Sequence, residues 1–520
     1  MDTPAVLGYY TADEVRAAEA ELFTRVADGM PMRRAAFGLA DVVARELRAR
    51  TGTVAGRTVT LLVGSGDNGG DVLWAGSFLR RRGVAVRAVL LTPERVHAQG
   101  AAALRRTGGR LVEAPPTPET LRFDVGVPGA RNAGLRQFAR TTSLVPDAVL
   151  ELLGTPDLVV DGIVGISGRG PLRPVAAELV AGVRCPIIAA DLPSGVDPDT
   201  GVVTGPAVRA DVTVTFGAHK PVHAMAAPYC GRIELVPIGL RLPAANLVAL
   251  PPRSIGRDWP VPGASDDKYT QGVTGVCAGS ATYPGAAILC TGGAVAATSG
   301  MVRYAGAGAE QVLAHFPEVI AAESVSATGR VQSWVFGPGA GTDAAARDRL
   351  AEILATDLPV VVDADGLTLL AADPSLVTGR TAPTVLTPHA GEFERLTGAD
   401  PGPDRVSAVR KLADSWQVTV LLKGRATLIA TPGHPVTVNE AGGSWAATAG
   451  SGDVLSGVIA ALLAAGKSPA WSAAAAARAH ALAANLAAHT DTTAGAPISA
   501  SPLLSHLRTA IGTLRELAAG

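Results

Sequence analysis

Two glycine-rich acidic loops, one in each half of the chain, constrain its fold more than any other feature. The first is Gly64-Ser65-Gly66-Asp67-Asn68-Gly69-Gly70-Asp71, which directly follows an apolar run at residues 59–63. The second is Ala449-Gly450-Ser451-Gly452-Asp453, which directly precedes the apolar segment 454–463. One pattern predicts a strand followed by a loop, the other a loop followed by a helix. Such loops can hold a phosphate on backbone N–H groups while a carboxylate faces the reacting group. Two of them predict two nucleotide sites and two activities.

The length of the chain requires more than one hydrophobic core. Its 520 residues predict two domains of roughly 250 residues each. With 48% hydrophobic and 18% charged residues, the chain is expected to be globular and not disordered. The net charge of -1 and the lack of a dense Lys/Arg block argue against nucleic acid as the partner. The cysteines Cys185, Cys230, Cys277 and Cys290 show no CxxC spacing, which predicts free thiols in a reducing compartment.

Targeting and membrane signals are not expected in this chain. The opening residues Met1-Asp2-Thr3-Pro4 lack the basic region that begins a signal peptide. The apolar runs are interrupted by charge, Gly or Pro well short of the roughly 20 residues that a membrane span needs. We therefore expect a cytoplasmic protein with no membrane partner.

Short β-branched runs alternate with Ala-, Leu- and Arg-rich stretches, which predicts βαβ units and open parallel sheets covered by helices. The first 50 residues are expected to be helical, with a helix N-cap near Thr11. In the first half, strands are expected at residues 59–63, 84–91, 158–161, 186–190, 212–216 and 233–237. In the second half, strands are expected at residues 273–278, 333–336, 360–363, 384–387 and 418–422, with a late packed helix at 472–487.

The alternating pattern lapses between residues 240 and 267, where prolines accumulate and periodicity is weak. Such composition is typical of a linker. We therefore expect an α/β domain at residues 1–240, a linker at 241–260 and a second α/β domain at 261–520.

Four segments of the first half each follow an expected strand: residues 67–71, 161–171, 191–197 and 215–221. Parallel-sheet topology brings such strand ends together in one crevice. Their glycines allow the backbone to approach a pyrophosphate closely. Asn68, Asp161 and Ser194 supply hard oxygen ligands, which suit an alkali or alkaline-earth cation and do not suit zinc.

This set of segments resembles the NAD(P)H-hydrate epimerase domain over roughly residues 8–240. That family shows Asn-Asn-Gly-Gly-Asp-Gly, Asp-Ala-Leu-Phe-Gly-Thr-Gly, Asp-Ile-Pro-Ser-Gly and Thr-Phe-Gly-x-x-Lys-Pro in the same order. The resemblance implies a Rossmann-like three-layer αβα fold, a potassium ion on Asn68, Asp161 and Ser194, and Asp191 as the acid/base. It also implies that two loops bind the hydrate, through Asp67, Asn68, Gly69, Gly70 and Asp71, and through Gly165, Ile166, Ser167, Gly168, Arg169, Gly170 and Pro171, together with Asp191.

The first half departs from the family pattern at three places. Asp67 replaces the first Asn, Val72 replaces the Gly after Asp71, and residues 162–164 replace Ala-Leu-Phe. A carboxylate at Asp67 weakens the binding of a phosphate unless it faces away or meets a cation. Lys220 has two readings, a partner for phosphate or the end of a strand.

In the second half, the loop before the apolar helix has the clearest chemistry. Residues 450–452 would present N–H groups at a helix N-terminus and form an anion hole for a transferring phosphoryl group. Asp453 would sit at its mouth and take a proton from an attacking hydroxyl. The loop itself lacks the Gly-Lys-Ser/Thr sequence of a P-loop enzyme.

The loop resembles the Gly-Ala/Ser-Gly-Asp signature of ribokinase-like enzymes. Further segments, among them Tyr283-Pro284-Gly285-Ala286 and Thr387-Pro388-His389-Ala390-Gly391-Glu392, resemble the nucleotide-dependent NAD(P)H-hydrate dehydratases over roughly residues 255–518. The resemblance implies a ribokinase-like αβα fold with Asp453 as the base. It also implies a hydrate site of Ala286, Gly339, His389 and Asp453, and a nucleotide site of Lys423, Gly424, Arg425, Ala426, Thr427 and Gly452. One departure lies after the first helix, where residues 306–312 interrupt the family's Gly-Ala-Gly-Leu-Val-Thr-Val.

Several of these residues also have purely structural readings. A single Gly-Asp-Asn-Gly-Gly is typical of a tight turn, Asp161 could cap a helix, and residues 191–195 could form a plain turn. His389 could be an ordinary core or surface histidine, and Trp445 near the second loop could pack or stack on adenine. The ordered combination of segments, each at a strand end, favours function.

Together the two resemblances imply a bifunctional repair enzyme for hydrated NADH and NADPH. The first domain would interconvert the R and S epimers with potassium, and the second would dehydrate the S epimer with Mg²⁺ and ADP, giving AMP and phosphate. A homo-oligomer is expected. The alternatives are a ribokinase-like small-molecule kinase with an appended nucleotide-binding domain, and a non-enzymatic dinucleotide sensor or scaffold. The sequence leaves open ADP against ATP as donor, NADH against NADPH hydrate, and whether both domains are fully active.

Overall fold

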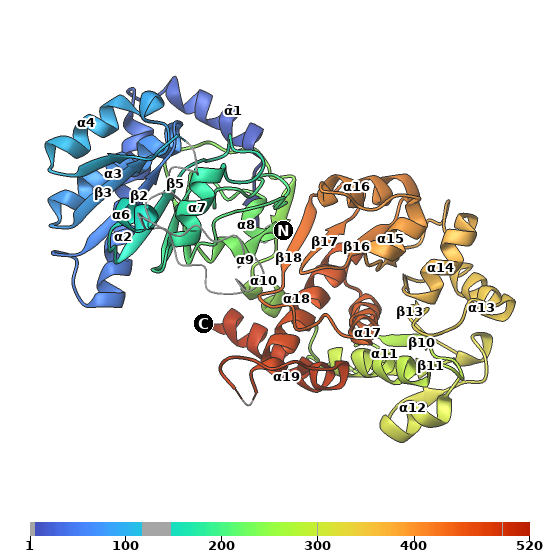
Figure 1. Ribbon diagram of the computed structural model, residues 1–520. Coiled ribbons are helices and arrows are strands. Elements are labelled where there is room, and N and C mark those ends of the chain that lie inside the picture. Colours follow the sequence, from blue (N-terminus) through green and yellow to red (C-terminus); the bar gives the residue numbers. More distant parts are fainter. Residues whose placement is uncertain (1–5, 117–146, 299, 491) are drawn as a thin grey trace, which may run out of the picture. The chain divides into compact units, whose positions relative to one another are not determined.

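The computed structural model describes residues 6–116, 147–298, 300–490 and 492–520. The chain divides into two compact units: Tyr9–Ala244, and Ala245–Gly520 together with the N-terminal residues up to Gly8. Each unit is an α/β structure with helices on both faces of its sheet (Figure 1). The expected fold class, two α/β domains, is therefore confirmed.

In the first unit, seven described strands form a fully parallel sheet in the order β4-β3-β2-β5-β6-β7-β8. This strand order, with the reversal between β2 and β5, is that of doubly wound dinucleotide-binding folds. The strands are β2 (Thr58–Val63), β3 (Ala85–Leu90), β4 (Arg110–Glu113), β5 (Leu158–Gly162), β6 (Ile187–Ala190), β7 (Val212–Phe216) and β8 (Arg232–Val236).

The central strands of this sheet are buried on both faces, which explains their continuous apolar sequences. One face packs against α2 (Met30–Thr51), α3 (Asp67–Arg81) and α4 (Ala98–Arg106). The other packs against α6 (Asp147–Leu153) and α7 (Pro174–Gly182). The other α-helices among the described residues of this unit are α1 (Ala12–Phe23), α8 (Val222–Met225) and α9 (Ala227–Cys230). Thr11 caps α1 in a capping box with Glu14, so the predicted N-cap is confirmed.

In the second unit, the described strands form a mixed sheet in the order β1-β9-β18-β17-β16-β15-β14-β13-β10-β11-β12. Neighbours from β16 to β12 in this order run parallel, whereas β17 pairs antiparallel with both β16 and β18. The strands are β1 (Leu7–Tyr9), β9 (Leu247–Ala249), β10 (Val273–Cys277), β11 (Met301–Tyr304), β12 (Ile320–Ala321), β13 (Ser333–Phe336), β14 (Val360–Val362), β15 (Thr384–Leu386), β16 (Thr419–Leu422), β17 (Ala426–Ala430) and β18 (Val436–Glu440).

Three apolar helices cover one face of this sheet: α11 (Pro284–Ala297), α17 (Ser451–Ala464) and α18 (Pro469–Ala488), backed by α19 (Ala500–Ala519). Helices α13 (Ala344–Leu354), α14 (Asp365–Ala372), α15 (Ala390–Thr397) and α16 (Arg405–Trp416) flank the other face (Figure 1). Helix α17 is buried along almost its whole length, so its N-terminus at Gly450 is held rigidly under the sheet edge. A short helix, α12 (Ala309–His315), follows β11.

Three local expectations differ from the structure. The expected linker contains β9 and α10 (Pro252–Asp258), and Trp259 donates from Nε1 to the carbonyl of Ala297 at 3.0 Å. Residues 67–71 form the first turns of α3, so the phosphate-binding loop shortens to residues 64–66. Strand β11, which the sequence did not predict, lies upstream of the interrupted residues 306–312 and pairs in parallel with β10.

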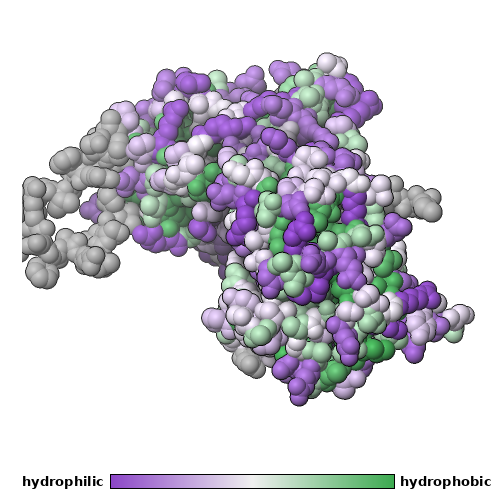
Figure 2. Space-filling model, turned by 90° about the vertical axis from the view of Figure 1, so that its right-hand side faces the viewer, coloured by the Kyte–Doolittle hydropathy of each residue, from purple (hydrophilic) through white to green (hydrophobic). Residues whose placement is uncertain are grey.

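Among the described residues, no helix combines the length and the apolar character that crossing a bilayer requires. On the face shown in Figure 2, hydrophilic residues are spread among hydrophobic ones. The four cysteines are free thiols, as the sequence predicted.

Candidate functional sites

In the first unit, the carboxyl ends of four parallel strands surround a cavity of about 500 Å³. Strand β2 leads into Ser65 and Gly66, β5 into residues 163–168, β6 into Asp191, and β7 into Phe216 and Lys220. Helix α1 closes the cavity with Arg16 and Glu19. The segments that the sequence predicted to converge therefore do meet at one edge of the sheet, the edge where doubly wound folds bind ligands.

Most of the predicted epimerase-domain residues line this cavity. They are Asp67, Asn68, Asp71, Gly165, Ile166, Ser167, Gly168 and Asp191. Gly69 and Gly70 are buried in α3 instead, where a Cβ on Gly69 would lie 2.3 Å from the carbonyl oxygen of Gly64. Arg169, Gly170 and Pro171 do not line it, because the Arg169 guanidinium turns to the carboxylates of Asp197 and Asp199.

Asp191 is held at the end of β6 in a left-handed backbone conformation, with φ of 68°. This conformation is uncommon for residues other than glycine and clusters at functional sites. Its Oδ1 accepts a hydrogen bond from Lys220 Nζ at 2.5 Å, and the ammonium also donates to Thr215 Oγ1 and the Phe216 carbonyl. Lys220 is 1% exposed. It lines the cavity with its ammonium bonded to Asp191, Thr215 and Phe216, an arrangement that neither reading from sequence included.

His223 contacts the backbone of both Lys220 and Asp191. Its Nδ1 accepts from the Lys220 backbone N–H, and its Nε2 lies 3.0 Å from the Asp191 carbonyl oxygen. Burial, followed by the neighbouring Lys220 charge, lowers the pKa of His223 to about 3. The ring is therefore neutral, and its remaining proton on Nε2 is donated to Asp191.

Asp161, Ser194 and Asn68 come together beneath the cavity around the carbonyl of Val164. Ser194 donates from its backbone N–H to Asp161 Oδ2 at 2.8 Å and from Oγ to Asp161 Oδ1 at 2.7 Å. Asn68 donates from Nδ2 to the Val164 carbonyl, while its buried Oδ1 has no hydrogen-bond partner within the described residues. Burial raises the pKa of Asp161 to about 6, against the lowering effect of hydrogen bonds from Ser194 and Ile163.

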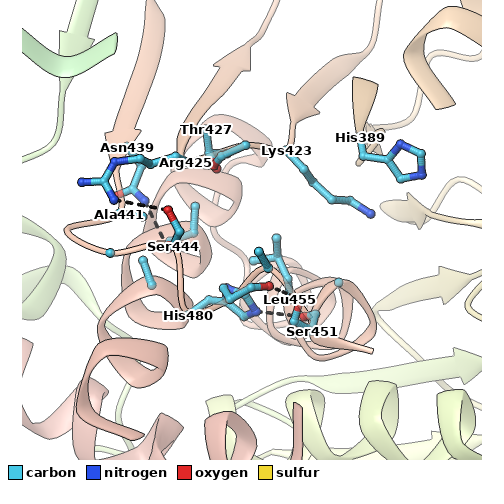
Figure 3. A pocket seen from close by; sticks show the side chains of 17 residues that line it. His389, Lys423, Arg425, Thr427, Asn439, Ala441, Ser444, Ser451, Leu455 and His480 are labelled. Carbon is cyan, nitrogen blue, oxygen red and sulfur yellow. Dashed lines mark hydrogen bonds between the residues drawn. The ribbon is translucent and has the colours of Figure 1, made fainter. Parts of the chain in front are cut away.

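In the second unit, a cavity of about 300 Å³ lies between the strand ends and the N-terminus of α17. Lys423, Gly424, Arg425, Thr427 and Gly452, all predicted nucleotide-site residues, line it. Ala426 does not, because it lies buried within β17. Figure 3 shows Lys423 and His389 on one side of the cavity and His480, Ser451 and Leu455 on the opposite side.

Sequence reasoning missed part of this cavity. Asn439, Ser444 and His480 also line it, and His480 lies with Nε2 2.8 Å from the carbonyl oxygen of Ser451. Burial lowers the pKa of His480 to about 4, so the neutral ring donates to that carbonyl and fixes the loop. The available signal was a histidine inside an Ala-rich helix. Trp445 does not line the cavity and packs edge-on against His489 at 5.8 Å.

A charged network adjoins the cavity. Lys423 Nζ lies 2.7 Å from Asp363 Oδ1 and 3.8 Å from Glu392 Oε2. Ser456 on α17 donates to the other oxygen of Asp363 at 2.6 Å. Asp363 follows β14, where Ala364 adopts a left-handed backbone with φ of 48°, as Asp191 does in the first unit. The network therefore links the strand end to the helix that carries Asp453.

Asp453 lies in the first turn of α17. Burial raises its pKa to about 7, and the carboxylates of Asp363, Asp365 and Glu392 add to this while Lys423 opposes it. A carboxyl with such a pKa exchanges protons readily at neutral pH, which is the property of a general base.

The remaining predicted hydrate residues lie in two places. Ala286 and Gly339 are neighbours, since a Cβ on Gly339 would lie 2.9 Å from the Cβ of Ala286. His389 lines the 300 Å³ cavity, is 59% exposed at its side chain, and caps α15 through Nδ1 in a capping box with Glu392. His389 therefore both caps α15 and lines the cavity.

Fold and sites together define a two-domain α/β protein with a separate ligand cavity at the strand ends of each domain. Comparison with known proteins gives the family. A family model described as YjeF-related protein N-terminus matches residues 30–222, and one described as NAD(P)H-hydrate dehydratase matches residues 274–505.

Full-length relatives agree with both models. The bifunctional NAD(P)H-hydrate repair enzyme of Mycobacterium leprae is 57% identical over 97% of this chain and 99% of its own length. That of Mycobacterium tuberculosis H37Rv is 58% identical over 88% of this chain and 89% of its own length. Among solved structures, an ADP/ATP-dependent NAD(P)H-hydrate dehydratase from Bacillus subtilis, co-crystallised with ATP/Mg²⁺, is 24% identical with a TM-score of 0.45, covering 51% of this chain and 98% of that one. The chain belongs to the family of bifunctional NAD(P)H-hydrate repair enzymes, with an epimerase domain followed by a dehydratase domain.

Proposed function

We propose that the first unit interconverts the R and S epimers of hydrated NADH and NADPH, and that the second dehydrates the S epimer at the expense of ADP, giving AMP and phosphate. The proposal rests on two carboxylates: Asp191, which lines the cavity of the first unit, and Asp453, in the first turn of α17 next to the cavity-lining Gly452 of the second unit. Each has a neighbouring lysine, Lys220 beside Asp191 and Lys423 near Asp453.

In the epimerase domain, Asp191 exchanges a proton with the C6 hydroxyl of the hydrated nicotinamide. Lys220 holds Oδ1 of the carboxylate, and Oδ2 faces Gly165, where an added Cβ would lie 3.5 Å away. The hydrate lies along residues 64–68 and 165–168, where backbone N–H groups and the N-terminus of α3 favour its phosphates. Asp67 is exposed at the cavity, so its carboxylate can turn to solvent.

Potassium fits the oxygen set below this cavity. The buried Oδ1 of Asn68 lacks a partner, and the fully buried Asp161 has hydrogen bonds but no cationic side chain among its recorded partners. Asn68, Asp161 and Ser194 would hold the ion, with the donor chemistry of an alkali cation. When bound, the ion supplies the positive charge that balances Asp161. Asn68 then orients the first turn of α3 toward the hydrate.

In the dehydratase domain, Asp453 takes the proton of the C6 hydroxyl, whose oxygen attacks the terminal phosphoryl group of the nucleotide. The N–H groups of residues 450–452 and the ammonium of Lys423 stabilise the negative charge of the transferring group. Phosphate then leaves as the ring-nitrogen lone pair forms an N1=C6 iminium ion, and loss of a proton from C5 gives the C5=C6 double bond of NAD(P)H. Ala286 and Gly339 lie against the hydrate, while Lys423, Gly424, Arg425, Thr427 and Gly452 hold the nucleotide. His389, which lines the 300 Å³ cavity, also contacts the hydrate. Mg²⁺ arrives with the phosphates of ADP and neutralises their charge.

The test uses an equilibrated R/S mixture of hydrated NADPH with excess ADP and Mg²⁺, and follows the absorbance of regenerated NADPH. A dehydratase that lacks epimerase activity serves as the control. Rapid recovery of the whole mixture is the expected result. Recovery that stops at the S fraction would contradict the epimerase assignment. No recovery with either ADP or ATP would favour a ribokinase-like small-molecule kinase.

We also propose that the protein is cytoplasmic and homo-oligomeric. The free thiols suit a reducing compartment, and the side chains of Phe23 and Phe37, 60% and 56% exposed, offer apolar surface for self-association. Light scattering during size-exclusion chromatography measures the oligomeric state, and a monomer at micromolar concentration would contradict that part of the proposal.

A further inference from the structure

Asp71 is a buried carboxyl of the epimerase cavity that the mechanism above does not use. It lies on α3, lines the 500 Å³ cavity and also lines an adjoining cavity of about 520 Å³. Its residue is 8% exposed, and its Oδ1 has no hydrogen-bond partner among the described residues. A buried polar atom without a partner is costly. Its position on the cavity wall points to a ligand that supplies the missing hydrogen bond.

The surroundings of Asp71 favour its protonated form. Burial raises the pKa of Asp71 well above its usual value, and the carboxylates of Asp191, Asp67 and Glu19 raise it further against the lowering effect of Lys220. The other charged or titratable groups lining the two cavities are Arg16 on α1, Asp28 and Arg33 near the start of α2, Arg95 after β3, and His97 at the start of α4. Asp71 therefore has a proton to donate, whereas Oδ1 of Asp191 already accepts the Lys220 ammonium.

The two carboxyls belong to different elements. Asp71 lies on α3, the helix that follows β2, and Asp191 lies directly after β6; in the sheet, only β5 separates β2 from β6. Adjacent strands lie roughly 4.8 Å apart, so the two strand ends are about 10 Å apart. The loop after β5, residues 163–168, also lines the cavity. Both carboxyls therefore line one cavity but come from different elements, α3 and the turn after β6.

We propose that Asp71 is a second catalytic residue of the epimerase domain, acting on one face of the hydrated ring while Asp191 acts on the other. The inference rests on the proposed epimerase function. Inversion at C6 by loss and return of water requires an acid where the hydroxyl departs and a base where water adds. One protonated and one ionised carboxyl, in one cavity but on different elements, supply both.

In the conversion of one epimer to the other, the C6–O bond breaks as its electron pair goes to oxygen, the Asp71 proton joins that oxygen, and water leaves. The N1 lone pair forms the N1=C6 double bond of an iminium ion. Water then adds to C6 from the opposite face, its proton passes to Asp191, and the π electrons return to N1. Asp71 ends ionised and Asp191 protonated, which are the states needed for the reverse direction, and exchange with solvent resets them.

The test is Asp71→Asn, which keeps the shape of the side chain and removes the transferable proton. The assay follows conversion of purified R hydrate of NADH to the S form by chromatography, in water enriched in ¹⁸O. We expect kcat for epimerisation to fall about 100- to 10,000-fold with KM changed only a few-fold. In the wild type, every epimerised molecule should carry solvent oxygen at C6. The matched control is Asp41→Asn, an exposed carboxylate on α2 that lines neither cavity, which should stay within a few-fold of wild type.

Each other outcome overturns a distinct claim. Unchanged kcat in Asp71→Asn, or a loss confined to KM, would refute the catalytic role of Asp71, as would S hydrate that retains its original oxygen. A wild type that does not accelerate epimerisation would instead refute the proposed function. Thermal unfolding of the Asp71→Asn preparation reports whether the first unit is folded, because dehydration depends on the second unit alone. Should the variant not fold, the wild-type pH profile decides, because epimerisation must fall at high pH as Asp71 loses its proton, and a rate that stays level would refute the role.

Discussion

The ammonium of Lys220 lies 2.5 Å from Oδ1 of Asp191, and its other two N–H bonds are taken by the Thr215 hydroxyl and the Phe216 carbonyl. All three donors of the lysine are therefore used inside the protein. The pair is almost fully buried, so the lysine fixes the rotamer of the aspartate and leaves Oδ2 for the substrate. Lys220 is in this sense a positioning residue for Asp191.

Replacing Lys220 by Met should abolish most epimerase activity and destabilise the first unit. The change leaves the Asp191 carboxylate buried without its partner, which costs about 3–5 kcal/mol. Denaturant unfolding measures the free energy, and the R-to-S assay measures the activity. The double variant Lys220→Met/Asp191→Asn should recover much of the stability and none of the activity. Equal stability of the single variant and the wild type would contradict the buried ion pair.

The strands of the first unit could be predicted almost completely, because a parallel sheet covered on both faces leaves continuous apolar runs between polar loops. Strand β4 was missed, because it carries Arg110 and Glu113 at its two ends and none of its residues is fully buried. In the second unit, the β17–β18 hairpin was missed, because its first strand begins directly at the predicted nucleotide segment. The prolines of the expected linker concealed α10, which begins at Pro252 and packs against α19.

The sequence located the candidate sites as segments but could not pair individual side chains. Asp191 and Lys220 are 29 residues apart, and their contact depends on β6 and β7 being neighbours in the sheet. The same applies to Lys423 and Asp363, which follow β16 and β14. Glu19 was missed altogether, because a glutamate on an amphipathic helix carries no signal of the cavity that the helix closes.

The dehydratase activity should fall at acidic pH because Asp453 becomes protonated. Because its pKa is raised to about 7 by burial first and nearby carboxylates second, only about one tenth is ionised at pH 6. We expect kcat/KM for S hydrate to fall tenfold per unit below pH 7 and to stay level above it. The control is epimerisation by the same preparation over the same pH range. Asp453→Asn should bind ADP but show no dehydration, and a wild-type profile that is flat from pH 5 to 8 would refute the base.

The same pKa predicts an effect on stability. A carboxyl whose pKa is raised on folding stabilises the fold while it is protonated, and this contribution is lost as the pH rises through about 7. Asp453→Asn should therefore melt at a higher temperature than the wild type at pH 8, and the difference should shrink toward pH 5. Thermal unfolding at these two pH values measures it, and a difference that grows in acid would contradict the assigned direction.

Potassium should stabilise the first unit through Asn68, whose buried Oδ1 lacks a partner in the described structure. A ligand that binds only the folded state at 100 times its dissociation constant adds about 2.7 kcal/mol. We expect thermal unfolding to shift upward in potassium chloride relative to choline chloride at equal ionic strength. Asn68→Ala should remove most of that shift. An equal shift in the variant would show that the ion binds elsewhere.

Lys423→Met should impair dehydration strongly and leave epimerisation unchanged. The ammonium lies 2.7 Å from Asp363 and lines the nucleotide cavity, so its loss removes a charge from the transferring phosphoryl group. It also leaves Asp363 with only the Ser456 hydroxyl as a side-chain partner. We expect weaker ADP binding by calorimetry and a kcat lower by at least about 100-fold, the scale measured for lost charge stabilisation. Lys411→Met, an exposed lysine on α16, is the matched control and should behave as wild type.

Gly339→Ala tests whether the Ala286–Gly339 contact forms part of the hydrate site. Gly339 has φ of +60°, and an added Cβ would lie 2.8 Å from the Cβ of Tyr283 and 2.9 Å from that of Ala286. Since these are backbone-proximal atoms, the loop must shift, and we expect KM for S hydrate to rise at least tenfold while ADP binding is kept. Gly379→Ala is the control for backbone strain alone, because Gly379 has φ of +85° with no atom within 4 Å of the new Cβ. Its cost should be about 1 kcal/mol of stability with unchanged KM. If both variants raise KM equally, strain and not a local clash accounts for the effect, and the hydrate does not contact this loop.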